Sequence, residues 1–414
     1  MADTARCSAG KPGAALSVDA ARLRAIAVAR PVEQETLALV SAVGRVLAAP
    51  VFANSPLPPF DNSAMDGYAV SLADLSGEGP WDVPVTLRIA AGDSRGLTLA
   101  QGEAAQVFTG APVPKGADAV VMQENVTRLG DRITFFLRPQ SGQNIRRRGE
   151  DVQIRGRALA VGVELTPPRL ALLAGCGVTD VAVHRRVRIA MFSTGDELVE
   201  PGGDLAPGQI YNSNRIMLGA LMDRRWADVT DLGILRDNPA RVRAAIREAA
   251  QSHDVVISSG GVSAGEEDHI LDALRAENAR LDILKVAIRP GKPLTVGRVA
   301  DALFFGLPGN PYAAAITFSQ IVRPALRRVA GLCEDPDIWI PAVSGFSYTR
   351  SAGRREFVPV TWSQRDQIGR PVLERLGRGA SASLYPIAQA QGIAVLPPEI
   401  ANILPGMPLR VEPI

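Results

Sequence analysis

The sequence has 414 residues, of which 46% are hydrophobic and 21% charged, and a formal net charge of +2. This length predicts two to four domains, and the balanced charge argues against nucleic acid as a partner. Three cysteines and three histidines, all scattered, fit neither a disulfide framework nor a Cys/His zinc site. The N-terminus lacks a secretory pattern, and no apolar run is long enough to span a bilayer. We expect a cytoplasmic protein with no membrane partner.

The first part of the chain is predicted to combine helices with a small β domain. Residues 1–15 are small and polar, and we expect them to be disordered. Apolar periodicity predicts helices at 17–28 and 32–49, and a third at 168–175. Between them, from about 70 to 139, short strand-like runs alternate with turn residues, which is typical of a β-rich domain.

From about residue 188, strand-like runs alternate with helical ones. This spacing predicts βαβ units, a mostly parallel sheet and helices on both of its faces. The strand-like runs are 187–192, 229–235, 255–258, 281–288, 294–299 and 303–306, and the helical ones are 214–225, 239–252, 269–277 and 312–329. After residue 335, short strands bounded by glycine and proline return and continue to the C-terminus.

These patterns predict a multidomain protein of α/β plus β class. Its center is a mostly parallel, three-layer α/β domain. Together with a family resemblance set out below, which implies the split linker and the insertion, these patterns divide the chain into a disordered N-terminus (1–15), a helical linker domain (16–51 and 151–186), an inserted β domain (52–150), the α/β domain (187–331) and a C-terminal β domain (332–414).

Four polar loops follow predicted strands of the α/β domain, at 193–197, 236–238, 258–268 and 307–311. Because the carboxyl ends of parallel strands meet at one edge of a sheet, we expect these loops to converge. Glycines such as Gly260 and Gly261 allow backbone N–H groups to approach a phosphate, and nearby acids can hold a divalent cation. Any one of these loops could equally be an ordinary turn before a capped helix. Together they predict a nucleotide-phosphate site.

Two groups of charged residues are candidates for the chemistry. Glu197, Asp237 and Asp268 carry only oxygen donors, which suits magnesium better than zinc, although each alone is also explained as an acid at a helix N-terminus. Lys285, Arg289 and Lys292 surround a Pro-Gly turn and suit an oxyanion, or else form a solvated basic turn.

A third charged group is the arginine run at 146–148. It is at least as well explained by salt bridges to Glu150 or Asp151 in an exposed loop as by nucleic-acid contact, because the net charge of the chain is close to zero.

Several segments together resemble one protein family. They are 60–69, 109–114, 142–151, 193–198, 258–263, 290–293 and 306–311. They are similar, in order, to the motifs of the molybdopterin molybdenumtransferases, the MoeA family, which is related to gephyrin. The resemblance implies that the protein inserts molybdate into the dithiolene of adenylated molybdopterin, releases AMP and forms molybdenum cofactor.

The resemblance also implies an architecture and partners. It implies a helical linker, an inserted β domain, an α/β domain like that of the molybdopterin adenylyltransferases and a C-terminal β-barrel. It implies a homodimer whose site lies between the α/β domain of one subunit and the β domain of the other, with magnesium as cofactor. Transient contacts with molybdopterin adenylyltransferase and apo-molybdoenzymes are expected.

The family motifs assign roles to individual residues. Asp66 and Thr109 correspond to positions supplied by the second subunit, and Asp151 follows the arginine run. The magnesium and AMP phosphate are expected at Glu197, Asp237 and Asp268. The expected substrate-binding and basic residues are Ser258, Gly260, Gly261, Ser263, Lys285, Arg289, Lys292, Pro308 and Pro311.

The resemblance is weakest in the C-terminal domain. Ser381 is placed at the molybdate-contacting serine, although the loop could align differently. An arginine of the same domain is expected near molybdate, and Arg354, Arg355 or another could supply it. In addition, Arg289 is more often lysine in the family, which keeps the charge but changes the donor geometry.

Two other functions are consistent with parts of the sequence. An adenylyltransferase would fit the α/β domain alone, but the segments 60–69 and 109–114 argue against it. A non-catalytic, gephyrin-like scaffold is the other alternative. Nothing resembles the long disordered linker of such a scaffold, and the acids are intact.

Overall fold

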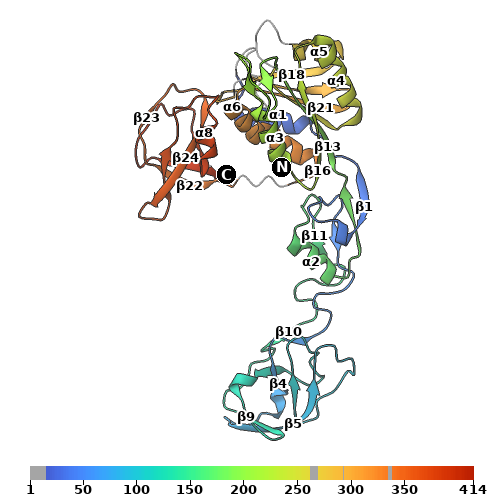
Figure 1. The fold of residues 1–414 in the computed structure, drawn as a ribbon. Coiled ribbons are helices and arrows are strands. Elements are labelled where there is room, and N and C mark those ends of the chain that lie inside the picture. The colour runs from blue at the N-terminus through green and yellow to red at the C-terminus, as the bar shows by residue number, and fades with distance from the viewer. Residues whose placement is uncertain (1–14, 262–268, 292, 334–337) are drawn as a thin grey trace, which may run out of the picture.

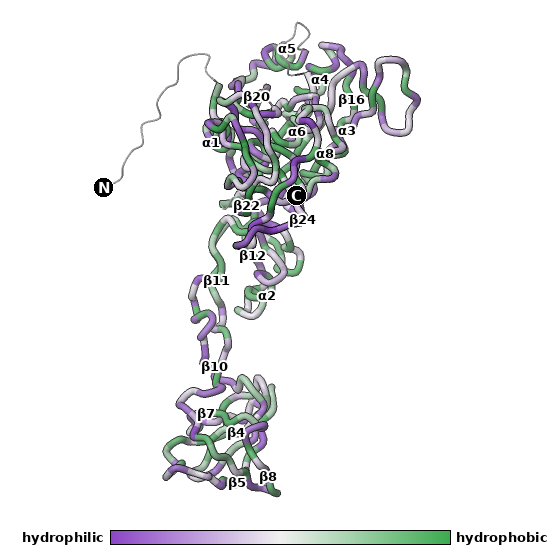
Figure 2. Tube along the Cα trace, turned by 90° about the vertical axis from the view of Figure 1, so that its left-hand side faces the viewer, coloured by the Kyte–Doolittle hydropathy of each residue, from purple (hydrophilic) through white to green (hydrophobic). Residues whose placement is uncertain are grey.

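The computed structural model describes residues 15–261, 269–291, 293–333 and 338–414. The molecule is elongated and bent (Figure 1). A small β domain stands at one end, a narrow linker follows, and the α/β domain and C-terminal domain lie at the other end. A view turned by 90° also separates the β domain from the rest of the chain (Figure 2). Within the described ranges, no helix is long and apolar enough to cross a membrane.

The α/β domain is built on a six-stranded sheet with the order β16-β13-β17-β21-β20-β18. The parallel strands are β16 (Ala227–Leu235), β13 (Val187–Thr194), β17 (Val255–Ser259) and β21 (Ala302–Leu307). A hairpin of β20 (Pro293–Val299) and β18 (Arg280–Lys285) completes the sheet in antiparallel pairing. The predicted mostly parallel sheet is therefore confirmed.

Helices cover both faces of this sheet, as β13 illustrates. Val187, Ile189 and Met191 pack into one core, and Ala190 and Phe192 into the other, because successive strand residues point to opposite faces. The first core is closed by α3 (Ser213–Met222), α6 (Pro311–Thr317), a π-helical turn η4 (Phe318–Val322) and α7 (Arg323–Val329). The second is closed by α4 (Pro239–Ser252) and α5 (His269–Ala276).

The N-terminal segment differs from its prediction in two respects. Helix α1 (Val18–Val28) forms as expected, but it packs on α7 and η4 of the α/β domain. The predicted helix at 32–49 is wrong: Gln34–Ala38 is strand β1, followed by a 3-10 turn, η1 (Leu39–Ser41). Strand β1 pairs with β12 (Asp180–His184), a partner far along the chain that local periodicity cannot reveal.

The linker and the inserted β domain follow. The linker contains α2 (Pro167–Gly175) and a pair of strands, β2 (Val51–Phe52) and β11 (Arg157–Leu159). A second pair, β3 (Asn62–Ser63) and β10 (Ile145–Arg146), joins it to the β domain. That domain is a sheet of β7 (Ala119–Met122), β4 (Gly67–Val70), β6 (Ala104–Val107), β5 (Trp81–Ile89), β9 (Arg132–Phe135) and β8 (Thr127–Leu129), with short turns η2 (Leu72–Asp74) and η3 (Gln123–Asn125).

The C-terminal domain is a closed five-stranded barrel, which confirms the expected fold. The ring runs β24 (Arg355–Arg365), β25 (Pro371–Arg375), β22 (Ile340–Ser344), β28 (Pro408–Pro413) and β26 (Gly392–Leu396), and β26 pairs back with β24. The smaller elements are β23 (Tyr348–Thr349), β27 (Asn402–Ile403) and α8 (Tyr385–Ala388).

One strand of the α/β domain joins that barrel. Strand β19 (Ile288–Arg289) pairs in parallel with the start of β24, with Ile288 opposite Arg355 and Arg289 opposite Glu356. This pairing fixes the barrel beside the carboxyl edge of the central sheet, and it therefore determines which barrel residues reach that edge.

Candidate active site

A cavity of about 860 Å³ opens at the carboxyl edge of the central sheet. The loops after all four parallel strands contribute to its lining, as the sequence predicts. Glu197 follows β13, Asp237 follows β16, Gly260 follows β17 and Pro308 follows β21. A short parallel pair, β14 (Leu198–Val199) and β15 (Ile210–Tyr211), forms one wall.

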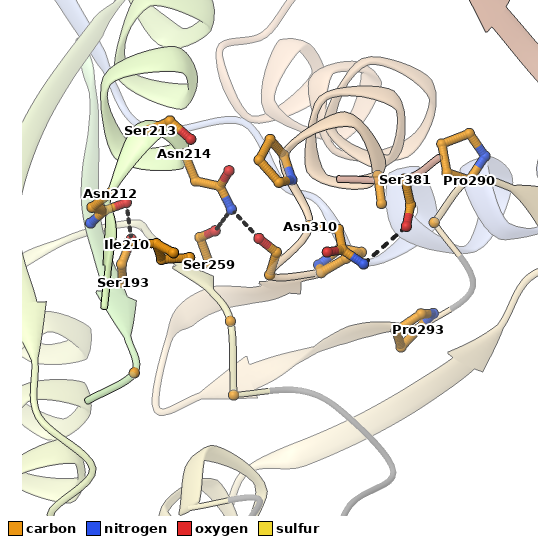
Figure 3. Close-up of a pocket in the computed structure, with 18 of the residues that line it drawn as sticks. Ser193, Ile210, Asn212, Ser213, Asn214, Ser259, Pro290, Pro293, Asn310 and Ser381 are labelled. Atoms are coloured by element: carbon orange, nitrogen blue, oxygen red, sulfur yellow. Dashed lines mark hydrogen bonds between the residues drawn. The ribbon is translucent and has the colours of Figure 1, made fainter. Parts of the chain in front are cut away.

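Asn214 holds two of these loops together. Its Nδ2 donates to Ser259 Oγ at 2.8 Å and to the backbone oxygen of Gly309 at 2.7 Å (Figure 3). Asn214 lies in the first turn of α3 and is 7% exposed. On the opposite side, the backbone N–H groups of Asp196 and Asp237 each donate to the other residue's carboxylate at 3.2 Å. The loops are thus held by polar contacts as well as by the strands that precede them.

Two adjacent glycines shape the loop after β17. Gly260 and Gly261 have φ angles of +93° and +68°, a region that favours glycine. A Cβ on Gly260 would lie 2.8 Å from the backbone oxygen of Thr194, and one on Gly261 would lie 2.6 Å from Thr194 Oγ1. The loop therefore keeps its backbone close to the end of β13, and the Gly260 N–H donates to the backbone oxygen of Leu307 at 3.1 Å, which holds the loop against β21 as well.

The barrel closes the other side of the cavity. The Nδ2 of Asn310 donates to Ser381 Oγ at 3.0 Å (Figure 3). The backbone N of Tyr312 donates to the backbone oxygen of Ser381 at 3.1 Å. Arg354 also lines the cavity, whereas its neighbour Arg355 forms a bidentate pair with Asp19 of α1, at 2.8 and 2.7 Å. Ser381 therefore lines the cavity, and of the two neighbouring arginines Arg354 lines it and Arg355 does not.

Comparison with known proteins identifies the family. The chain matches the MoeA N-terminal region (domain I and II) over residues 16–177, a probable molybdopterin binding domain over 190–328, and the MoeA C-terminal region (domain IV) over 341–414. A molybdopterin molybdenumtransferase of Haemophilus influenzae is 37% identical over 393 residues, covering 92% of this chain and 94% of that protein. The chain belongs to the molybdopterin molybdenumtransferase family.

Further relatives agree in sequence and in fold. The molybdopterin molybdenumtransferase 2 of Mycobacterium tuberculosis is 38% identical, covering 91% of this chain and 94% of its own length. A crystal structure of a molybdopterin biosynthesis moeA protein from Pyrococcus horikoshii OT3 superposes with a TM-score of 0.81 at 26% identity, over 97% of this chain and 100% of that one. The molybdopterin molybdenumtransferase resemblance predicted from the sequence motifs is confirmed.

The acids expected around a metal in this family are partly brought together. Glu197 and Asp237 both line the cavity. The Glu197 carboxylate folds over Gly195, whose absent Cβ would lie 2.3 Å from its Oε2. Asp268 and Ser263 lie outside the described residues. Among the residues that are described, no cluster of three His, Cys, Asp or Glu side chains forms a complete metal site.

The predicted basic residues have different positions relative to the cavity. Arg289 lines it, on β19 and preceding Pro290. Lys285 is exposed on β18 and does not line the cavity. Its partner in the β18–β20 pairing, Pro293, does line the cavity. Lys292 is outside the part of the chain that the structure describes.

The remaining substrate-binding predictions lie at or beneath the cavity. Pro308 and Pro311 line it, and Pro311 begins α6. Ser258 is fully buried in β17, one residue before the cavity lining. Its hydroxyl is buried without a hydrogen-bond partner among the described residues.

Three predicted residues lie in or next to the β domain, away from this cavity in the same chain (Figure 1). Asp66 accepts hydrogen bonds from the backbone N and Oγ1 of Thr109 at 2.7 and 2.8 Å. Asp151 accepts from Arg146 at 2.6 Å, and Glu150 accepts from the same arginine. The predicted salt bridges of the arginine run are thus confirmed, and Asp66 and Thr109 form a separate polar pair.

Sequence reasoning missed several polar residues of the cavity. Asn212 and Asn214 flank the start of α3, and Asn310 precedes α6. Asn212 is the N-cap of α3, and its side-chain oxygen accepts from the Arg215 N–H at 3.4 Å. The signal in the sequence was an Asn-Ser-Asn cluster before a helical run. Such a cluster indicates a helix cap, and only the fold places these side chains at the cavity.

Proposed function

We propose that this protein inserts molybdate into adenylated molybdopterin and releases AMP, forming molybdenum cofactor in the last step of its synthesis. The observation that carries this proposal is that one cavity joins two kinds of surface. Its α/β side offers backbone N–H groups and carboxylates, which suit a nucleotide phosphate and a divalent cation. Its barrel side brings guanidinium and hydroxyl groups, which suit an oxyanion.

The AMP half of the substrate is proposed to bind along the loop after β17. The Gly260 N–H donates to the Leu307 oxygen and fixes the loop against β21. The positive φ and missing side chain of Gly261 let a phosphate approach the backbone there. Ser259, held by Asn214, adds a hydroxyl at the same place. Pro308 and Pro311 stiffen the neighbouring turn, so that the pocket loses little entropy when a nucleotide binds.

Magnesium is proposed to bind at Glu197, Asp237 and Asp268. The donor set supports this, because Glu197 and Asp237 enter the same cavity and offer only oxygen ligands, as a hard cation requires. When bound, the ion would polarise the adenylate phosphate for cleavage.

The molybdate end is proposed to lie between the barrel and β19. Arg289 and Arg354 supply two planar guanidinium groups, and Ser381 supplies a hydroxyl fixed by Asn310. Guanidinium groups bind tetrahedral oxyanions through paired donors. Exchange of oxo ligands for dithiolene sulfurs depends on proximity and protons more than on a protein nucleophile. Lys285 and Lys292 are proposed to add positive charge that favours oxyanion binding.

A second subunit is proposed to complete the site. Asp66, Thr109 and Asp151 are too remote to serve the cavity of their own chain (Figure 1). In a homodimer, the β domain of one subunit would cover the cavity of the other and exclude water from it. We place this dimer in the cytoplasm, with transient contacts to a molybdopterin adenylyltransferase, which supplies the substrate, and to apo-molybdoenzymes, which take the product.

The proposal is tested by incubating the purified protein with adenylated molybdopterin, molybdate and magnesium and measuring AMP. AMP release should require molybdate and should fall at least about 100-fold in the double variant Glu197→Gln, Asp237→Asn. Asp204→Asn, an exposed acid of the loop between β14 and β15, is the matched control and should retain activity. Full AMP release without molybdate, or in the double variant, would refute the proposal. Pyrophosphate formed from ATP and molybdopterin would indicate an adenylyltransferase instead.

A further inference from the structure

Glu356 is a buried carboxylate at the junction between the α/β domain and the barrel. It is 3% exposed and lies at the start of β24, directly opposite Arg289 of β19 in the pairing that joins the two domains. A charge in such a position is costly unless it is paired and hydrogen-bonded. The groups that Glu356 contacts therefore indicate its role.

Glu356 is connected by contacts to both arginines of the cavity, Arg289 and Arg354. Its Oε1 accepts from Tyr348 Oη at 2.9 Å and lies 3.5 Å from Arg289 Nε. Its Oε2 lies 3.5 Å from Nη1 of Arg350. The same Nη1 donates to the backbone oxygen of Arg354 at 2.8 Å. One carboxylate is thus in contact with the Arg289 side chain and, through Arg350, with the backbone that carries Arg354.

The Arg350 side chain, which connects Glu356 to the backbone of Arg354, is held in one position. Its side chain is 1% exposed, and its Nε donates to the backbone oxygen of Ile400 at 3.0 Å. A guanidinium held by several carbonyl oxygens in a fixed fork has little freedom to rotate. The position of Arg354 is therefore determined by the interior of the barrel.

We propose that Glu356 is a positioning residue for oxyanion binding, which holds Arg289 and Arg354 toward the cavity. This inference rests on the proposed function, in which those arginines bind molybdate. Two guanidinium groups aimed at one place repel each other, and Arg289 is 37% exposed and could turn to solvent. A buried negative charge behind them offsets the repulsion and limits that rotation before the anion arrives.

The inference predicts a specific kinetic effect of Glu356→Gln. The amide keeps the volume and an acceptor for Tyr348 but removes the charge. The KM for molybdate should rise about tenfold, as expected for losing a charge-assisted contact, while kcat changes less than about twofold. A purely structural role would instead lower kcat, through a smaller active fraction, at unchanged KM. The variant should fold because Arg350 keeps its carbonyl partners.

Two further variants make the test decisive. Glu356→Asp retains the charge on a shorter side chain, so the KM for molybdate should rise less than in Glu356→Gln. This variant also tests the inference if Glu356→Gln does not fold. Glu412→Gln is the matched control. Glu412 accepts from Gln320 at 2.9 Å and from Arg323 at 2.7 Å across the same pair of domains, but it is outside the cavity lining. It should leave the KM unchanged.

Equilibrium dialysis with inorganic molybdate separates this inference from the proposed function, because binding requires no turnover. Weaker binding by Glu356→Gln together with wild-type binding by Glu412→Gln supports the inference. Equal binding by wild type and Glu356→Gln overturns it, as does equal weakening in the two variants or no binding by the wild type. If the wild type binds molybdate but releases no AMP, the proposed function fails, and the dialysis result still decides the role of Glu356.

Discussion

Asp66 and Thr109 are joined by two hydrogen bonds to a single carboxylate oxygen. The Thr109 backbone N lies 2.7 Å from Asp66 Oδ1, and Thr109 Oγ1 lies 2.8 Å from the same atom. The backbone bond, and then the hydroxyl bond, lower the pKa of Asp66 below its ordinary value of 3.8. The pair lies beside the paired ends of β4 and β6 in the β domain, and its hydrogen bonds favour the ionised carboxylate.

Replacing Thr109 by Val should raise the pKa of Asp66 part of the way back toward 3.8, because the hydroxyl bond is lost and the backbone bond remains. An NMR titration of the Asp66 carboxyl carbon measures this change directly. Thr109→Ser, which retains the hydroxyl, should restore the lower value. An unchanged pKa in the valine variant would show that the hydroxyl does not hold the carboxylate.

A site shared between subunits should allow two inactive variants to complement each other. Asp66→Asn damages the β-domain side and Glu197→Gln the cavity side, so each homodimer should be inactive. In random mixtures, half of the dimers are mixed and each of these has one intact site, so about a quarter of wild-type AMP release should return. Mixing Glu197→Gln with Asp237→Asn is the control and should restore nothing, since both changes affect the same side.

Asp254 links the start of β17 to two arginines and should make stability depend on pH. Burial alone would raise its pKa, but hydrogen bonds from Arg185 and Arg188 outweigh this and lower the pKa to about 2. Because the folded pKa is below the unfolded value of about 3.9, the stabilisation is complete above about pH 5 and is lost as the pH falls toward 2.

The magnitude follows from the shift and can be measured. Asp254→Asn should lower the free energy of unfolding by about 2 kcal/mol at pH 7 and by progressively less below pH 4. Urea unfolding followed by the fluorescence of the buried Trp226 reports on this domain. The exposed pair of Asp272 and Arg275 gives the control: Asp272→Asn should cost less than about 0.5 kcal/mol. A pH-independent effect of Asp254→Asn would contradict the prediction.

Gly261→Ala should damage both the fold of the cavity and nucleotide binding. The new Cβ would need a φ of +68° and would meet Thr194 Oγ1 at 2.6 Å and Ile270 Cδ1 at 2.7 Å. We expect a loss of about 2 kcal/mol in stability and at least about tenfold weaker AMP binding. Gly406→Ala is the matched control, with φ of +84° and open space around its Cβ, and isolates the backbone strain from the clash. Equal AMP binding in both variants would refute the proposed phosphate loop.

Asn214→Ala should separate the loops after β17 and β21. Both hydrogen bonds from its Nδ2 are lost, which leaves the buried Ser259 hydroxyl and the Gly309 oxygen without that donor and costs about 1–3 kcal/mol. The value of kcat/KM for AMP release should fall about 10–100-fold. Asn54→Ala, which removes a comparable bond to the Gly177 oxygen in the linker, should leave kcat/KM near the wild-type value.

Local pattern was sufficient for the architecture of the cavity. A parallel sheet brings the carboxyl ends of its strands to one edge, so the convergence of the loops carrying Glu197, Asp237, Gly260 and Pro308 followed from strand–helix alternation. It was not sufficient at Gln34–Ala38. The spacing of apolar residues there suited a helix, but pairing with Asp180–His184 makes it a strand.

The sequence by itself determined the family, the sheet and the loops that meet at its edge, because these depend on residues close together in the chain. Tertiary structure decided which barrel residues join them. Arg354 and Arg355 are neighbours with the same charge, but Arg354 ends the bend before β24 and Arg355 is the first residue of the strand. The pairing of β19 with β24 turns Arg354 toward the cavity and Arg355 toward Asp19. Which of the two arginines reaches the cavity depends on how the two domains pack against each other, and this cannot be predicted from a local sequence pattern.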